Sequence, residues 1–443
     1  MTDKTNETVM EKIVSLCKRR GFVYQGSEIY GGLAGMWDYG PYGVTLRDNI
    51  KNMWWKRFVI DREDMYGVKA AILMHQDVWK ASGHVGGFSD PLVECKKCKR
   101  RFRADHLEDK KKCPECGGEL GEEKKFNMMF KTHVGATEDE ASVSYLRPET
   151  AQGMFVNFKN IRDTFSPKLP FGLAQIGIAF RNEIAPRDFI FRLREFEQME
   201  IEYFVDPRDE KKVDETFNTL FDEQMAYLND IGLNARKIHK IDVPAEDRAH
   251  YSKRSVDTEF DFPFGQKELL GLAYRTDFDL KAHIEKSGVD LSYFDEETKE
   301  RFVPHCIEPT FGVDRLMLAV LSDAYTEDEV GGEKRVYLKF APKVAPVKVA
   351  VFPLLKNKPQ LVEKAKDVYA ALKKEIDGVE FDDNGNIGKR YRRQDEIGTP
   401  FCVTVDFDTV EKDAGVTVRD RDTGEQVRMS VEEVVEKIKE ACR

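Results

Sequence analysis

The stretch of sequence that decides the fold is residues 175–204, QIGIAFRNEIAPRDFIFRLREFEQMEIEYF. Two runs of alternating apolar and polar residues flank a short charged loop that contains Pro186, and this pattern predicts a β-hairpin. The mostly apolar side consists of Ile176, Ile178, Phe180, Leu193, Met199, Ile201, Tyr203 and Val205. The opposite side has arginines, carboxylates and the ring of Phe196 beside small Gly and Ala residues. It is either a charged face exposed to solvent or a floor that binds a flat, anionic ligand such as a purine nucleotide.

Three motifs occur in order along the chain and resemble those of class II aminoacyl-tRNA synthetases. Arg181-Asn182-Glu183, a loop, Arg192, Phe196 and Glu200 resemble motif 2, and residues 308–315, EPTFGVDR, resemble motif 3, whose arginine opens a helix. Residues 147–153, RPETAQG, resemble a segment of the subgroup that uses small amino acids. The similarity runs nearly end to end, and the whole chain resembles the homodimeric glycyl-tRNA synthetases. The resemblance implies a ligase that activates glycine with ATP, releases pyrophosphate, and transfers glycine to the 3′ end of tRNA(Gly).

The resemblance also implies the residues of an ATP site, with Arg181 and Arg315 as the catalytic pair. Arg181 would hold the α-phosphate and the reacting carboxylate, and Arg315 the γ-phosphate of a bent ATP, because arginine stays charged and binds phosphate through two donors. Phe196 would stack on adenine opposite Arg315, and Glu183 would accept from the adenine amino group. Magnesium, which prefers oxygen ligands, would be bound by Glu268 and Glu308. The remaining implied ATP-binding positions are Asn182, Phe191, Arg192, Leu269, Gly312 and Asp314.

The glycine site must bind an ammonium group and exclude any side chain. By resemblance, carboxylates do both, and the implied positions are Glu149, Glu200 and Glu308, with Phe196, Gln198, Thr310 and Gly312 around them. An arginine of the RFRADH stretch would also reach the substrate; position favours Arg101, with Arg103 as the alternative. No smaller amino acid competes with glycine, so we expect a steric sieve and no editing domain. No side chain can be named as the general base of the transfer step, for which the substrate phosphate is the candidate.

Four of the eight cysteines form the pattern Cys95-x2-Cys98 and Cys113-x2-Cys116, with Gly117 and Gly118 after the second pair. Each pair suits a tight turn that offers two thiolates to one tetrahedral ion, so the spacing predicts a zinc site. Four thiolates leave no open coordination position, and the expected role is structural. Cys17, Cys306, Cys402 and Cys442 are scattered, and we expect them to be small apolar fillers.

The length of 443 residues suggests about two or three domains. We expect an α+β fold with a class II antiparallel-sheet catalytic domain over residues 1–340, a zinc-ribbon-like insert with the four cysteines at 88–125, a Pro-rich linker at 341–346 and an α/β anticodon-binding domain over 347–443. A predicted helix at 43–58 and strand at 68–74 lie where motif 1, the dimer interface of the family, belongs, although its closing proline is absent near Met74. A further amphipathic helix is predicted at 5–20, with Asn6 near its start.

Charge and hydropathy bear on nucleic-acid binding and on the location of the protein. The formal net charge of −10 argues against indiscriminate nucleic-acid binding but allows local basic surfaces that bind one RNA. Two candidates are the KKCKRRFR run of the insert and the cluster of Lys389, Arg390, Arg392 and Arg393, each of which could equally be a solvated face. The first twenty residues have no long apolar region, and no stretch approaches the roughly 18 apolar residues of a membrane span, so we expect a cytoplasmic protein.

Three other functions stay open on the sequence alone. The enzyme could use serine, threonine or proline, which an exchange assay with each amino acid would distinguish. A non-enzymatic synthetase-like protein, such as the polymerase accessory subunit that has this architecture, would lack the ATP-binding groups, all of which are present here. A zinc-ribbon nucleic-acid-binding module would explain the cysteines but leave most of the chain unexplained.

Overall fold

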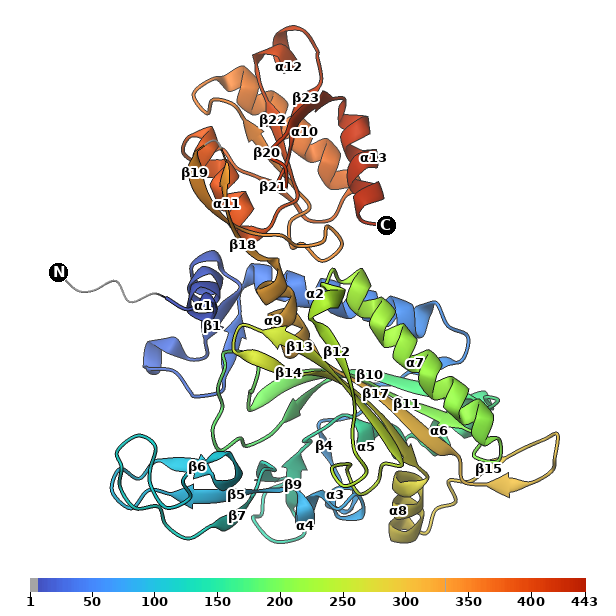
Figure 1. Cartoon of the computed structure of the whole chain (residues 1–443). Coiled ribbons are helices and arrows are strands. Elements are labelled where there is room, and N and C mark those ends of the chain that lie inside the picture. The colour runs from blue at the N-terminus through green and yellow to red at the C-terminus, as the bar shows by residue number, and fades with distance from the viewer. Residues whose placement is uncertain (1–6, 331) are drawn as a thin grey trace.

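The computed structural model describes residues 7–330 and 332–443, and among these a seven-stranded sheet forms the centre of the larger part of the chain (Figure 1). Its strand order is β12 (Ile238–Asp242), β13 (Arg254–Phe262), β14 (Gly265–Thr276), β17 (His305–Gly312), β11 (Glu195–Val205), β10 (Phe171–Phe180) and β3 (Met65–Gly67). Neighbouring strands are antiparallel except β10 and β3. The predicted hairpin is β10–β11, and the α+β prediction is confirmed.

Both faces of the hairpin contain buried side chains. Met199, Ile201 and Tyr203 of the apolar side lie in the main hydrophobic core, as the alternation predicts. On the opposite side, Glu200 is 2% and Glu202 0% exposed. The solvent-facing interpretation of this side is therefore wrong, and the carboxylates are enclosed.

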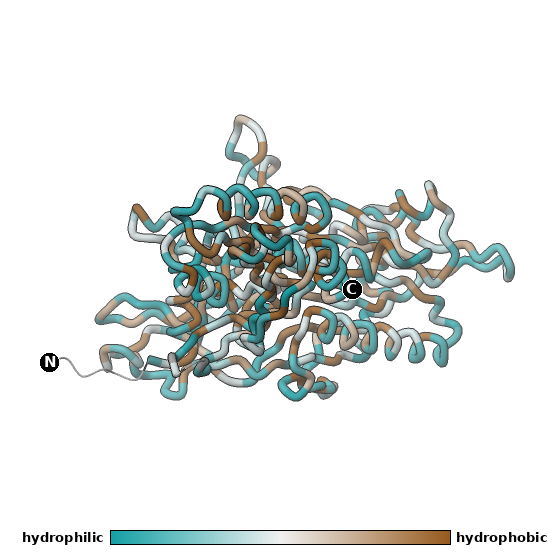
Figure 2. The backbone as a smooth tube through the Cα atoms, turned by 90° about the horizontal axis from the view of Figure 1, so that it is seen from above, coloured by the Kyte–Doolittle hydropathy of each residue, from teal (hydrophilic) through white to brown (hydrophobic). Residues whose placement is uncertain are grey.

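Helices cover most of one face of the sheet and one end of the other face. The covered face packs against α2 (Pro41–Trp55), α7 (Glu210–Asp230) and α9 (Val313–Ala324), whose apolar side chains join the main core. At one end of the other face lie α5 (Ala151–Phe155), α6 (Phe158–Phe165) and α8 (Phe278–Ser287), which pack around Phe171 and Phe204. Viewed from above, apolar segments gather in the middle of the molecule (Figure 2). None of the helices in the described residues has the length and apolar character needed to cross a membrane.

The motif 1 region differs from the prediction. The helix expected at 43–58 is α2 with a π-helical continuation, η2 (Lys56–Ile60), but the strand expected at 68–74 is replaced by β3 and the short β4 (Leu73–Met74). Between them the Val68 amide still donates to the Ala174 carbonyl of β10 at 2.8 Å, and the backbone of Ala70 is bound by side chains. The amide of Ala70 donates to Gln175 at 2.6 Å, and its carbonyl accepts from Arg147 at 3.0 Å. Farther upstream, α1 (Val9–Arg20) begins after the N-cap Thr8, and the predicted helix start near Asn6 lies outside the described residues.

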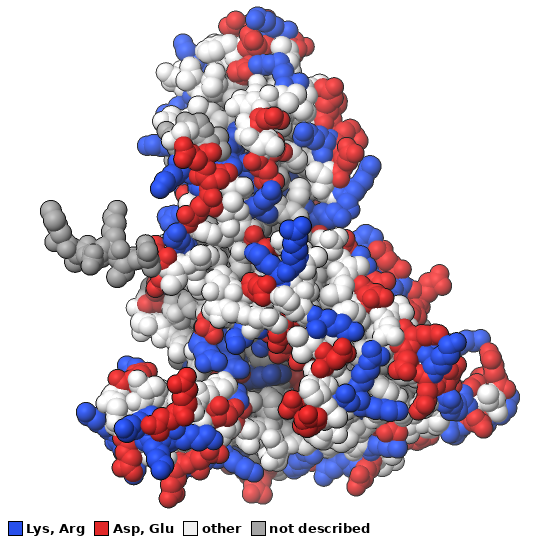
Figure 3. Space-filling view, in the orientation of Figure 1, with Lys and Arg blue, Asp and Glu red and all other residues white. Residues whose placement is uncertain are grey.

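The cysteine-containing insert forms a small sheet of its own beside the body (Figure 1). Its strands are β5 (Ser89–Glu94), β6 (Arg101–Arg103) and β7 (Lys124–Asn127). Three of its basic residues are ion-paired within the insert, Lys96 with Glu119, Arg100 with Glu115 and Arg101 with Glu94. Figure 3 accordingly shows both charges interspersed on this module.

The C-terminal part contains a second sheet, with five described strands in the order β21 (Val379–Phe381), β20 (Val349–Pro353), β22 (Phe401–Val405), β23 (Val416–Asp420) and β24 (Gln426–Met429). Its helices are α10 (Pro359–Glu375), α11 (Ile387–Ile397), α12 (Phe407–Glu411) and α13 (Val431–Ala441). The predicted linker is not a free connection, because Val344 and Ala345 are fully buried in the main core.

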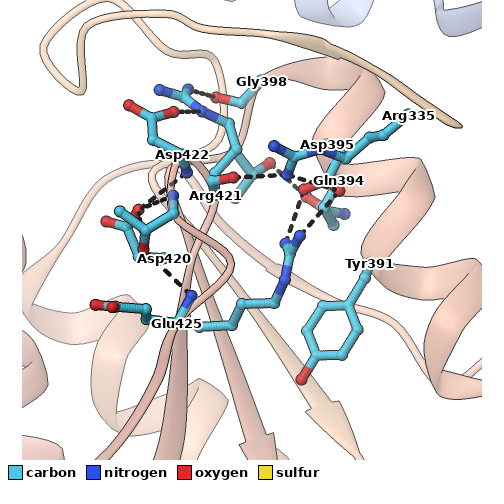
Figure 4. A network of polar contacts seen from close by, with 12 residues as sticks. Arg335, Tyr391, Gln394, Asp395, Gly398, Asp420, Arg421, Asp422 and Glu425 are labelled. Carbon is cyan, nitrogen blue, oxygen red and sulfur yellow. Dashed lines mark hydrogen bonds and ion pairs between the residues drawn. The ribbon is translucent and has the colours of Figure 1, made fainter. Parts of the chain in front are cut away.

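A hairpin, β18 (Tyr325–Val330) and β19 (Glu333–Leu338), follows α9 and is fastened to the C-terminal part by buried charges (Figure 4). Arg335, fully buried, binds Asp328 on its own hairpin, lies 3.5 Å from Asp395 of α11 and donates to the carbonyl of Arg421 at 2.6 Å. Arg419 completes the cluster with two bonds to Asp395 at 2.8 and 3.1 Å. The hairpin therefore packs as an extension of the C-terminal part.

The basic cluster predicted on α11 is not a uniform surface. Arg390 is 1% exposed and donates to the backbone carbonyls of Pro353, Asp383 and Gly385. Arg393 is bound to Asp382 at 2.6 Å. Arg390 is thus a structural residue that joins the loop between β21 and α11 to the end of β20, and it cannot reach a tRNA phosphate.

We expect Arg390→Met to destabilise the C-terminal sheet by about 2–4 kcal/mol, because several buried carbonyls lose their donor. Native-state hydrogen exchange of the β20 and β22 amides in the full chain measures this local stability. Lys389→Met, a change at the neighbouring exposed residue, is the matched control and should shift the same amides by less than about 0.5 kcal/mol. Equal effects of the two substitutions would contradict the structural role of Arg390.

Candidate active site

Two adjoining cavities open on the partly covered face of the sheet. One has a volume of about 240 Å³ and the other about 290 Å³. They share the lining residues Arg181, Gln198, Glu268, Gly271 and Thr310. Figure 3 shows Lys and Arg side chains around the recess between the insert and the body. The two cavities together therefore form one site with two compartments.

The register of the central strands decides which residues meet in this site. Glu200 is paired with Gln175 on one side and with Thr310 on the other, and Thr310 is opposite Gly271. One rung along, Gln198 lies between Gly177 and Gly312. A Cβ atom added at Gly271 would meet no atom within 4 Å. Gly271 thus leaves room above the sheet near the polar side chains of β11, whereas a Cβ atom at Gly177 would clash with the Arg147 guanidinium.

The first compartment is lined by arginines and aromatic rings. Arg181, Arg192 and Arg315 all border it, together with Phe191 and Phe196. The guanidinium of Arg181 lies 5.3 Å from the centre of the Phe196 ring, and that of Arg315 lies 4.5 Å from the Phe191 ring. Phe196 and Arg315 both face this space, so the predicted stacking of adenine between them stays a prediction.

Glu183 enters this compartment with an unused acceptor. The side chain is 8% exposed, and among the described residues its Oε2 has no hydrogen-bond partner. Arg192 approaches that oxygen at 4.0 Å, while Arg194 fixes the Glu183 carbonyl through bonds of 3.0 and 3.1 Å. A buried carboxylate oxygen without a donor favours a ligand that brings an N–H group. Asn182 differs: its backbone donates to Met128, and it does not belong to the lining.

Carboxylates, among them Glu200 and Glu308, line the second compartment, and Glu202, outside its lining, is buried next to them. Oxygens of Glu200, Glu202 and Glu308 lie within 4.8 Å of one another, and all three residues are buried. Burial raises the pKa of Glu308 to about 8, and burial with the nearby Glu149 charge raises the pKa of Glu200. Burial also raises the pKa of Glu202 well above its usual range. The raised pKa values show that the protein supplies too little positive charge to these clustered carboxyl groups. An ammonium group bound among them would supply that charge, so the cluster favours a cationic ligand.

Glu149 and Arg275 border the same compartment. Burial by itself would raise the pKa of Glu149, but the His84 imidazole at 3.3 Å and the Arg275 charge hold it below its usual range. Arg275, 3% exposed, donates to Glu308 at 2.8 Å and forms two bonds of 2.8 Å to Asp279. Gln152 links Asp279 back to Glu149 with bonds of 2.9 and 3.0 Å. Two of the implied glycine ligands, Glu149 and Glu308, are thus connected through one buried series of hydrogen bonds.

Most of the implied residues reach the site, but Arg101 does not. Its side chain is 65% exposed and paired with Glu94. Arg103 lines the first compartment instead and is held by Asp90 at 2.8 Å and Asp105 at 2.6 Å. Both arginines belong to β6, but Arg103 is opposite Leu92, and Arg101 is opposite Glu94, closer to the cysteines.

Sequence reasoning missed several lining residues of the second compartment. They are Arg248, Tyr251, Asp257 and Arg275, three of which come from the loop and strand between Val243 and Asp257. The segment around Arg275, LAYRTDFDL, contained one signal: a lone arginine in an apolar run with Asp279 four residues on. The others had no local signal.

The four cysteines of the insert come together as predicted. Their sulfur atoms lie within 4.8 Å of one another, with 3.6 Å between Cys95 and Cys116 and 3.7 Å between Cys98 and Cys113. Four sulfurs about 2.3 Å from a central ion would be about 3.8 Å apart. Amide hydrogen bonds from Cys98 and Lys97 lower the pKa of Cys95 to about 6, which favours the thiolate. The geometry fits a tetrahedral zinc ion.

The magnesium ligands implied by the sequence lie in different surroundings. Glu268 is 51% exposed and lies 3.1 Å from Arg315, whereas Glu308 is buried against Arg275. Both line the second compartment. Among the described residues, the close acidic cluster around Glu308 contains Glu200 and Glu202 and not Glu268.

Two family descriptions match the chain. A tRNA synthetase class II core domain (G, H, P, S and T) matches residues 130–324, and an anticodon binding domain matches residues 348–441. The first range contains the three motifs that line the cavities. The second begins just before β20 and ends at the last residue of α13.

Curated proteins similar to the chain over nearly its whole length share one name. The glycine–tRNA ligase of Caldanaerobacter subterraneus subsp. tengcongensis is 52% identical and covers 99% of both chains. That of Clostridium acetobutylicum is 51% identical, with 99% of this chain and 100% of the relative covered. That of Thermobifida fusca is 50% identical, with 96% of each chain covered.

Proposed function

The chain belongs to the family of glycine–tRNA ligases, and we propose on this premise that its two compartments are the ATP and glycine halves of one active site. The enzyme activates glycine with ATP, releases pyrophosphate and joins glycine to tRNA. The observation that supports the assignment of the site is the sheet register, which brings an arginine-lined and a carboxylate-lined cavity together at Arg181.

Arginines would do most of the work of activation. The glycine carboxylate attacks the α-phosphorus of ATP, and negative charge builds on the phosphoryl oxygens. There is little covalent chemistry for protein groups, so the site acts by positioning and by cationic stabilisation. Arg181, at the junction, would hold the α-phosphate and the attacking carboxylate. Arg192, Arg315 and Arg103 would bind the other phosphates, and Glu183 would accept from adenine.

Selection of glycine would depend on the carboxylate compartment. The ammonium group would bind among Glu149, Glu200 and Glu308, and these side chains would occupy the space of any larger amino acid. Thr310 supports this arrangement by donating to Glu200 at 3.1 Å. Thr150 donates to the other oxygen of Glu200. A fixed carboxylate cage of this kind excludes alanine sterically and needs no editing step.

We expect Glu149→Ala to raise the KM for glycine by about 10²-fold, because a charge that faces the ammonium group inside a buried site is lost. The KM for ATP should change much less. Glu149→Gln tests the charge without a change of volume, and Glu195→Gln, at the exposed end of β11, is the control. An equal loss for both substrates would remove Glu149 from the glycine site.

Two metals belong to the proposal. Magnesium would be bound by Glu268 and Glu308 when ATP is present, and it would supply charge neutralisation at the phosphates. Zinc would be bound by Cys95, Cys98, Cys113 and Cys116, where it holds the two knuckles of the insert together. The sulfur spacing supports the zinc site.

The quaternary structure and location are proposals of the same kind. We propose a homodimer through the α2–β3 region, where β3 is an edge strand paired on one side with β10. Light scattering of the purified chain would measure its mass, and a monomeric mass would refute this. We propose a cytoplasmic location because the tRNA substrate is used there, which cell fractionation can check.

Glycine-dependent pyrophosphate–ATP exchange on the purified protein, with serine, alanine, threonine and proline alongside, tests the function. Exchange with glycine alone is the expected result. Exchange with a different amino acid would reassign the carboxylate compartment. No exchange in a folded protein with magnesium present would refute the proposed site.

A further inference from the structure

Beside the ATP compartment, a buried ionic cluster joins four elements of the fold. Its members are Tyr39 of β2 (Trp37–Tyr39), Arg47 and Lys51 of α2, Glu197 of β11 and Asp314 of α9. The side chain of Arg47 is 16% and that of Asp314 5% exposed. The guanidinium of Arg47 lies 3.9 Å from the centre of the Tyr39 ring, which fixes its orientation.

Asp314 is the centre of the cluster. Its Oδ1 accepts from the Tyr39 hydroxyl and lies 3.2 Å from Nη2 of Arg47. Its Oδ2 accepts from the backbone N–H of Glu197 at 2.8 Å. Both oxygens therefore have protein donors, and the carboxylate is committed to the protein although Asp314 borders the compartment. The implied role of this side chain as an ATP ligand is not supported by these contacts.

Arg47 connects the two halves of the cluster. Its Nη2 lies 3.1 Å from Oε2 of Glu197 as well as 3.2 Å from Asp314. Lys51, one helical turn on, approaches the same Glu197 oxygen at 3.1 Å. One guanidinium thus holds two carboxylates that would otherwise repel each other at close range.

The backbone pairing between β11 and β17 ends next to this cluster. The last paired residues of β11 and β17 at this end, within the described chain, are Gln198 and Gly312. Beyond that rung, the bond from the Glu197 amide to Asp314 continues the connection through a side chain. The neighbours of these two residues are Phe196 and Arg315, and both line the ATP compartment.

We propose that Arg47 is a positioning residue for ATP: it fixes the start of α9 against β11 and so sets the spacing between Arg315 and Phe196. Arg47 is outside the set of described residues that line the compartment, so it acts through Asp314 and Glu197. This inference rests on the proposed function, since it takes the compartment to be the ATP site.

The test compares Arg47→Met, which keeps the length of the side chain but removes its charge, with Arg47→Lys. We expect Arg47→Met to raise the KM for ATP in glycine-dependent exchange by about tenfold or more, because displacement of reacting groups by about 1 Å is costly. The KM for glycine should change by less than about twofold, since none of the five cluster residues is among the described residues that line the carboxylate compartment. Arg47→Lys, which restores the cation, should recover most of the ATP affinity.

Arg57→Met is the matched control. Arg57 lies in η2, the continuation of α2, and pairs with Glu223 at 2.6 Å and Asp230 at 2.5 Å on α7. It should lower the thermal unfolding midpoint without changing the KM for ATP. A parallel loss of ATP and glycine affinity in both variants would show a general structural effect and overturn the inference, as would unchanged ATP affinity in folded Arg47→Met.

Equilibrium binding of ATP without amino acid separates this inference from the proposed function. Weaker binding of ATP to Arg47→Met than to the unchanged chain supports the positioning role whichever amino acid is activated. Failure of the unchanged chain to bind ATP would overturn the assignment of the compartment, and the inference with it.

Discussion

Replacing Arg181 by alanine is expected to lower the rate of glycine-dependent pyrophosphate exchange by about 10³-fold, because a preorganised cation at the reacting phosphate is lost. Arg181 borders both compartments, its Nε donates to the Pro148 carbonyl at 3.1 Å, and its guanidinium lies over Phe196. That anchor directs the side chain toward the place where ATP and glycine would meet. Exchange measured at saturating ATP and glycine separates this loss from weaker binding.

Two comparisons make the Arg181 experiment specific. Arg181→Lys keeps the charge but loses the planar fork, so it should retain an intermediate rate. Arg187→Ala, in the loop of the same hairpin, removes an arginine that is 52% exposed and pairs with Asp188, and it should leave exchange near the original rate. Circular dichroism should be unchanged in all three variants. Retained exchange in Arg181→Ala would exclude this arginine from the chemistry.

Replacing Cys113 by alanine is expected to reduce the zinc content from about one ion per chain to near zero, because a structural zinc site loses several kcal/mol with one thiolate. Hydrogen exchange should rise first in residues 88–125. The KM for ATP should also rise, since Arg103 of the same insert lines the compartment that we propose for ATP. Atomic absorption of the purified variant gives the metal content directly.

Cys442→Ala is the control for the metal experiment. Cys442 is half-buried near the end of α13, outside the cysteine cluster. Its replacement should leave the zinc content unchanged. If Cys113→Ala also kept its metal, the ion would not be bound by the four thiolates.

The central hairpin could be predicted because its information is local. Alternation along residues 175–204 identified the core side through Met199 and Ile201, and the motif residues then fell on one side of the sheet by register. The sequence shows where small residues such as Gly271 occur, but it does not show that Gly271 is paired with Thr310 on the neighbouring strand. The two compartments follow from this pairing of β14 with β17 and from that of β11 with β17, whose partners Glu200 and Thr310 are 110 residues apart.

What could not be predicted depends on partners that only the fold supplies. Arg390 stands in a basic run at helical spacing and resembles a surface residue, but its carbonyl partners come from the end of β20 and from the loop before α11. Arg101 and Arg103 lie two residues apart on one short strand. Only the fold shows that Arg103 lines the cavity while Arg101 is exposed. Arg275 lacked any sign of its link to Glu308, since these residues meet only through adjacent strands.

The buried Arg335 cluster determines where the polypeptide can be divided. A cut at residue 341, where the prolines suggest one, would leave Asp395 with Arg419 but without Arg335, and would remove the Phe340 carbonyl that Arg421 binds at 2.9 Å. A cut before Tyr325 keeps the whole cluster on one fragment. Such a fragment would begin directly after α9, which runs from Val313 to Ala324. It would therefore leave the whole helix, about 18 Å long, with the larger part of the chain. A recombinant C-terminal fragment for tRNA-binding work should therefore start at residue 325.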